Sequence, residues 1–281
     1  MKFCRLMGYD VRNGILRKGY FYLIVLLMSG ILFAGFQHKL LQGQESIPNV
    51  KEEATLMNVL FYLFAGKAPF NPEVESAFLI PVVWLVIFLY PAFITLDYPF
   101  RNLTGQGIQV MIRSEERRYW WLSKCIWAFL GTISYFFVLY LSMTLFCMIS
   151  GMEVSLSYAP DINQRLLEMQ VEDLSENQVF CLVFILPVMT SLAVNFLQLC
   201  MGLFWDRMYC YLLSVIILFS SAYFLSPFAI GNFAMLKRSV FCDGAGLTVR
   251  QGIMVNTSLI VLSVILGAVR MEKFDILKKN G

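Results

Sequence analysis

Long apolar runs separated by short polar stretches dominate this chain of 281 residues. A bilayer core about 30 Å thick needs roughly 20 apolar residues for one helical crossing, so each long run predicts a membrane-spanning helix. The runs are too continuous for the alternating pattern of a membrane β-barrel. We therefore predict six transmembrane helices, at about residues 19–36, 77–94, 125–150, 179–205, 209–230 and 253–269.

Composition places the chain in the same class, because 58% of its residues are hydrophobic and only 15% are charged. A soluble domain has a far more polar balance. The predicted crossings and their connections use up nearly all of the length, so residues 1–281 are expected to form a single all-α transmembrane domain. Its expected surroundings are the lipid bilayer, with no nucleic acid as partner.

The distribution of lysine and arginine predicts the orientation, since these residues are retained on the cytoplasmic side. With an even number of crossings both termini lie on one side, and that side then holds 15 of the 22 cationic residues. The outer loop 151–178 is acidic instead. Both termini are therefore predicted to be cytoplasmic.

Two further segments carry short apolar patterns. In residues 1–18 the side chains of Phe3, Met7, Val11 and Ile15 share one helical face among basic residues, which predicts an amphipathic helix on the inner membrane surface; an ordinary tail is the alternative. The outer segment 37–76 contains an apolar stretch at 56–66, too short to cross, which predicts an interfacial or re-entrant helix rather than a plain surface loop. A similar short element is expected within 228–251.

The polar connection 95–124 predicts a break followed by a new helix. Gly105 and Gly107 interrupt the helical pattern, and Ser114, followed by two glutamates, is typical of a helix N-terminus. A helix from Ser114 to Ser150 has 37 residues and would be roughly 55 Å long, so it would project beyond the bilayer into the cytoplasm. Three residues in its first turns are expected to anchor it at the membrane interface: Trp120, Trp121 and Lys124.

The chain carries no pattern of catalytic or metal-binding residues. It has no G-x-S-x-G, H-E-x-x-H or CxxC sequence, and its single histidine, His38, falls at a membrane edge. The pair Glu115-Glu116 resembles part of a membrane-protease motif, but the histidines on later spans that such a site needs are missing. No phosphate-binding Walker sequence is present either, so any ATP must be hydrolysed by another chain.

Polar residues within the apolar runs are few. Asn195 and Gln198 lie on one face of the fourth run and are candidates for lining a substrate path, or alternatively for joining neighbouring helices. Charged residues are essentially absent from the middle of every run, which is unlike a proton-coupled carrier.

Taken together, these features resemble the membrane subunits of ABC-2 type transporters, which have the architecture of type V exporters. The resemblance covers the amphipathic start, six spans with both ends inside, the segment 113–124 (RSEERRYWWLSK) before the third span, the short outer elements and the ending 271–277 (MEKFDIL).

The resemblance implies a permease subunit in the bacterial cytoplasmic membrane that exports a substrate, with an amphipathic peptide, antibiotic or lipid-like molecule as the expected class. Its implied partners are two cytoplasmic ABC ATPase subunits, which bind ATP and Mg²⁺, and a second permease, identical or homologous. This chain itself would bind no cofactor and would not be an enzyme. A membrane scaffold or sensor without transport activity is the alternative.

By the same resemblance, the connection 95–124 is a coupling loop that contacts the ATPase. The residues implied in that contact are Gly105, Arg113, Glu115, Glu116, Arg117 and Arg118.

Overall fold

The fold is that of a computed structural model, which describes residues 2–15, 19–43, 53–70, 77–101, 117–170 and 174–273. Every regular element in these ranges is a helix, and β pairing there is limited to two isolated bridges. The prediction of an all-helical protein is confirmed. The α-helices are α1 (Lys2–Gly14), α2 (Tyr20–Gly43), α4 (Leu56–Phe64), α5 (Val82–Arg101), α7 (Arg117–Ile149), α8 (Pro160–Arg165), α9 (Glu176–Phe180), α10 (Leu186–Met201), α11 (Arg207–Tyr223) and α12 (Val249–Glu272).

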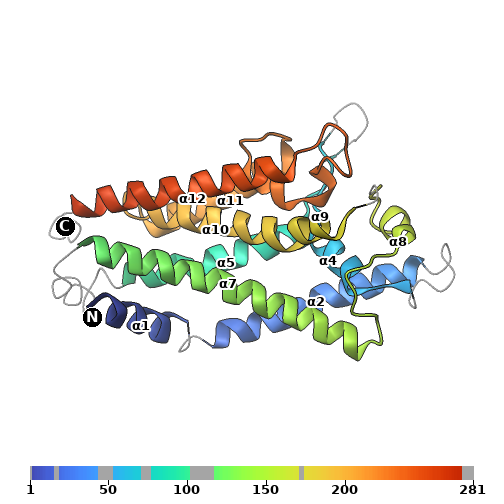
Figure 1. The fold of residues 1–281 in the computed structure, drawn as a ribbon, viewed down its shortest axis with the longest axis horizontal. Coiled ribbons are helices and arrows are strands. Elements are labelled where there is room, and N and C mark those ends of the chain that lie inside the picture. The colour runs from blue at the N-terminus through green and yellow to red at the C-terminus, as the bar shows by residue number, and fades with distance from the viewer. Residues whose placement is uncertain are drawn as a thin grey trace.

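The long helices run side by side along the longest axis of the molecule (Figure 1). One end carries α1, the start of α7 and the last turn of α12, and we call it the terminal end. The opposite end carries α4, α8 and two short 3₁₀ helices, η3 (Ile230–Ala234) and η4 (Leu236–Arg238), and we call it the loop end.

Four of the described helical stretches are long and apolar enough to cross a membrane: Tyr20–Gly43, Arg117–Ile149, Glu176–Met201 and Val249–Glu272. The apolar helices Val82–Leu96 and Arg207–Tyr223 are shorter. Large apolar side chains are exposed along these elements, for example Leu27, Ile31, Phe137, Leu212, Ile216 and Leu262. Such a continuous apolar exterior is compatible with a protein embedded in lipid.

Helix α10 lies at the centre of the bundle, in contact with α5, α7, α11 and α12. Within the apolar windows, 67% of the Glu176–Met201 residues are buried, against 22% for Val249–Glu272. The chain enters α10 through a π-helical turn, η2 (Cys181–Ile185), and Pro187 is the second residue after this turn. The regular α-helical hydrogen-bond pattern is therefore interrupted at the start of α10, the central helix.

At the loop end, short helices pack against the long ones. Helix α4 forms in the apolar stretch for which an interfacial or re-entrant helix was predicted at 56–66. It packs against α2, α5 and α7, and nearly all of its side chains are buried. Asn58 of this helix accepts hydrogen bonds from the Thr55 hydroxyl and the Ala159 amide, and donates to Asn163 at 2.9 Å. These bonds fasten α4 to α8 and the loop before it.

A fully buried arginine, Arg238, connects several segments of the loop end. The guanidinium of Arg238 donates to the carbonyl oxygens of Ser221 at 2.6 Å, Phe224 at 2.7 Å and Lys67 at 2.9 Å, and also to the Asn232 side chain. Its positive charge faces the C-terminal carbonyls of α11, where the helix dipole favours a cation. Burial lowers the pKa of Arg238 to about 10, so the group stays charged at neutral pH. The sequence placed this residue in an outer loop and gave no sign of its burial.

Candidate functional site

Helix α7 makes polar contacts with six neighbouring elements along its length. The contacts reach α12 and α1 near its start, then α10 and α2, then α5, and finally η2. At 33 residues the helix is roughly 50 Å long. A displacement of α7 would therefore act on most of the bundle at once.

A buried ion pair joins α1 to the second turn of α7. Lys124 Nζ lies 2.5 Å from Asp10 Oδ1, and the hydroxyl of Ser123 donates to Asp10 Oδ2, also at 2.5 Å. The side chains of Asp10 and Lys124 are each 1% exposed. Removing one partner of such a pair would leave the other charge buried without a counter-charge or water, which is strongly unfavourable. The ion pair therefore holds α1 against α7.

The face of α1 that meets α7 differs from the predicted one. The predicted apolar face is only partly buried at Phe3 and Val11, whereas Leu6, Asp10 and Gly14 are buried against the bundle. Gly14 is required there, because a Cβ atom at this position would lie 2.1 Å from the indole nitrogen of Trp127. Asp10 was missed as a functional residue, although it is the only acidic residue among the first 44.

The residues predicted as interface anchors point into the protein. Trp120, Trp121 and Lys124 are each about 1% exposed. Trp121 donates from Nε1 to the Val264 carbonyl at 2.9 Å and packs on Gly267 of α12, while the Lys124 ammonium lies 5.3 Å from the ring centre of Trp120. The basic and aromatic start of α7 is thus a packing surface for α1 and α12.

Two of the predicted coupling residues are described, and both contact the end of α12. Arg117 donates to the main-chain carbonyl of Glu272 at 3.2 Å, and Arg118 forms an ion pair with the Glu272 carboxylate. The pair is exposed, so most of the Arg118 side chain is open to solvent or to a partner. Gly105, Arg113, Glu115 and Glu116 lie outside the described residues.

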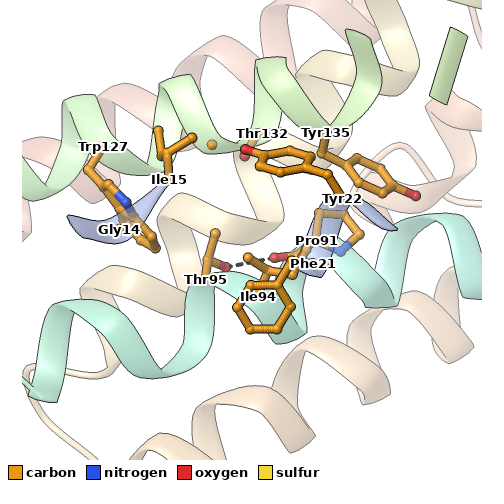
Figure 2. Close-up of a pocket in the computed structure, with 11 residues that line it drawn as sticks. Gly14, Ile15, Phe21, Tyr22, Pro91, Ile94, Thr95, Trp127, Thr132 and Tyr135 are labelled. Atoms are coloured by element: carbon orange, nitrogen blue, oxygen red, sulfur yellow. Dashed lines mark hydrogen bonds between the residues drawn. The ribbon is translucent and has the colours of Figure 1, made fainter. Parts of the chain in front are cut away.

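A small cavity marks the junction of α1, α2, α5 and α7 (Figure 2). Its volume is about 20 Å³, which is close to the roughly 10–15 Å³ that one water molecule needs. Trp127, Thr132 and Tyr135 of α7 face Pro91 and Thr95 of α5 across it. The cavity is too small to hold an amphipathic substrate. It leaves unfilled space next to the stretch of α5 that contains Pro91.

Two tyrosines of α7 replace hydrogen bonds that prolines remove. A proline has no N–H, so the carbonyl four residues earlier loses its helical donor. For Pro91 that carbonyl is Ile87, and it accepts from the Tyr135 hydroxyl at 2.8 Å. For Pro187 it is Val183, and it accepts from the Tyr140 hydroxyl at 2.7 Å. Tyr135 and Tyr140 lie in an apolar run, and nothing in the sequence pattern indicates that they have this role.

The predicted path residues lie buried between helices. Asn195 donates to Thr132 of α7 at 2.8 Å, and its Oδ1 atom is buried with no hydrogen-bond partner among the described residues. Gln198 donates to the Ala92 carbonyl of α5 and accepts from Ser214 of α11, both at 2.8 Å. Gln198 thus ties three helices together around α10, and neither residue lines a cavity described above.

The described residues contain no group of three histidine, cysteine or acidic side chains placed to hold a metal ion. Comparisons with protein-family models, with curated proteins and with solved structures find no match to this chain. The geometry therefore defines a helical bundle whose contacts between helices are centred on α7.

Proposed function

We propose that the chain is the permease subunit of an ABC-2 type transporter and moves an amphipathic substrate across the bacterial cytoplasmic membrane. ATP is hydrolysed by separate ATPase subunits, and a second permease, identical or homologous, completes the path. The six apolar segments cross the membrane with both termini in the cytoplasm. The chain contributes no catalytic group and binds no cofactor of its own.

The single observation that carries the proposal is the position of α7. The helix begins within the connection 95–124 that is proposed to meet the ATPase, and from there it reaches α1, α12, α10, α2, α5 and η2 through side-chain hydrogen bonds. A displacement of its first turn is transmitted to the stretches of α5 and α10 that contain Pro91 and Pro187. This is the connection that a subunit driven from outside its own chain needs.

Charge reversal tests the contact with the ATPase. We expect Arg117→Glu combined with Arg118→Glu to reduce co-purification of the ATPase and permease-stimulated ATP hydrolysis by about tenfold, since two charge-assisted contacts become repulsive. Membrane insertion should be unchanged. Arg250→Glu, at an exposed cation of the loop end, is the matched control and should have no effect.

The contact with Glu272 needs a separate control, because both arginines touch that residue. Glu272→Gln removes the intramolecular ion pair without changing the arginines. If this variant alone reproduces the loss, the arginines act through α12 and the docking role is wrong. Normal association and transport in the double charge-reversal variant would contradict the proposal as well.

Transport itself is tested in proteoliposomes that hold both chains. Substrate movement should stop when the catalytic residue of the ATPase is replaced. A complex that assembles normally but moves no substrate would identify the chain as a scaffold or sensor instead.

A further inference from the structure

A second and larger cavity lies at the loop end. Its volume is about 190 Å³, and it is enclosed by the end of α2, α4, the chain after α4, the start of α5 and η4. Its walls are mainly apolar or aromatic, and they include Tyr62, Leu63, Val83, Trp84 and Leu167. The Trp84 indole donates to the Ala234 carbonyl at 3.0 Å, so this wall is fixed against η3.

Two lysines, Lys39 and Lys237, line this otherwise apolar cavity. Lys39 reaches it from α2 and lies 5.5 Å from the ring centre of Tyr62. Lys237 reaches it from η4, where its backbone N–H donates to the Ala65 carbonyl at 3.1 Å. The neighbouring Arg238 is held by buried carbonyls, so the backbone that presents Lys237 is firmly positioned.

The positive charge of the cavity is only weakly neutralised by the described residues. Glu168 approaches Lys237 at 3.9 Å, but its side chain is 86% exposed and well solvated, whereas that of Lys237 is 17% exposed. Burial lowers the pKa of Lys237; Glu168 opposes this shift, and the positive charges of Lys39 and Lys67 add to it. The two cavity lysines therefore repel each other in a partly desolvated site, and an anion placed between them would relieve this repulsion.

We infer that this cavity binds the oxyanionic head of an amphiphile, a phosphate or a carboxylate, between Lys39 and Lys237. The aromatic and aliphatic wall takes the adjoining apolar part. The chemistry is that of anionic lipids, whose head groups lie at the depth of a helix end, and a free phosphate ion has the same head-group chemistry. The inference is independent of the transport proposal, because it needs neither an ATPase nor substrate movement.

Binding is tested by native mass spectrometry of the full chain in detergent. The probe is dioctanoyl phosphatidic acid, and dioctanoyl glycerol is the matched neutral ligand with the same acyl chains. We expect the phosphatidic acid to bind at least about tenfold more tightly than the glycerol. Lys39→Gln and Lys237→Gln should each weaken it by about tenfold, since each removes one charge-assisted contact. Arg250→Gln at the same end is the cationic control and should leave binding unchanged.

Inorganic phosphate distinguishes the two sources of the anion. Displacement of the lipid by phosphate at similar concentration supports a free oxyanion as ligand, whereas failure to displace it supports the lipid head group. Equal binding of the acidic and neutral lipids, or equal binding by the parent chain and Lys39→Gln, would overturn the inference. Lys39 is exposed near the end of α2, so its variant is expected to fold, and thermal unfolding of each variant checks this.

Discussion

At the scale of single residues, the hydroxyl groups of Tyr135 and Tyr140 compensate for prolines on other helices. Tyr135 is fully buried and Tyr140 is partly buried, and each donates to a carbonyl that Pro91 or Pro187 leaves without its helical donor. A buried carbonyl without a donor costs about 1–3 kcal/mol. The interrupted stretches of α5 and α10 are thus stabilised from α7, which contacts both helices.

This role predicts a specific coupling energy. Tyr135→Phe should lower the free energy of unfolding by about 1–3 kcal/mol, because the Ile87 carbonyl loses its donor. In a Pro91→Ala background the new N–H can bond to Ile87, so the same substitution should cost clearly less. Thermal or denaturant unfolding in detergent measures the cycle. Tyr209→Phe, at an exposed tyrosine, is the control. Equal losses in both backgrounds would contradict the assigned bond.

At the scale of elements, the sequence predicts the helices well and their faces poorly. The long apolar runs all form helices, because only a helix satisfies the backbone of such a run in lipid. Which side of a helix is buried depends on its partner instead. Asp10 pairs with Lys124 across 114 positions, and hydrophobic periodicity carries no information on such pairings. The burial of Arg238 escaped prediction for the same reason.

The close contact of α7 with α12 gives an element-scale prediction. A Cβ atom at Gly267 would lie 1.9 Å from Cζ2 of Trp121, so Gly267→Ala must push the helices apart. We expect a loss of about 1–3 kcal/mol, as for other overpacked cores, and partial rescue by Trp121→Leu. Gly131→Ala is the matched control, since nothing lies within 4 Å of its added Cβ, and it should change stability by less than about 1 kcal/mol. Similar unfolding midpoints for the two glycine variants would refute this packing.

At the scale of the whole molecule, two cysteines report on the two ends of the bundle. Cys4 is exposed on α1 at the terminal end, and Cys242 is partly buried at the loop end. The proposed topology, with six crossings and both termini inside, would place these thiols on opposite sides of the membrane. The chain has seven cysteines, and single-cysteine variants keep the labelling unambiguous.

A membrane-impermeant maleimide should label Cys4 in inverted vesicles and Cys242 in right-side-out vesicles. Burial raises the pKa of Cys242, so its thiolate fraction at neutral pH is small and labelling should accelerate by about tenfold per pH unit below that pKa. Labelling is therefore compared at pH 8.5 as well as at pH 7. A variant without either cysteine is the blank. Labelling of both positions from the same side would rule out the six-crossing topology.

The contact between Arg238 and the Lys67 carbonyl also bears on how the protein is made. The two residues are 171 positions apart, and a ribosome adding about 5–20 residues per second needs roughly 9–34 s to cover that distance. During this time the nascent chain contains α4 and Lys67, but not yet the Arg238 guanidinium that later binds the Lys67 carbonyl. The loop end accordingly cannot close until residue 238 has been synthesised, and a chain terminated before that residue leaves the ribosome with that end open.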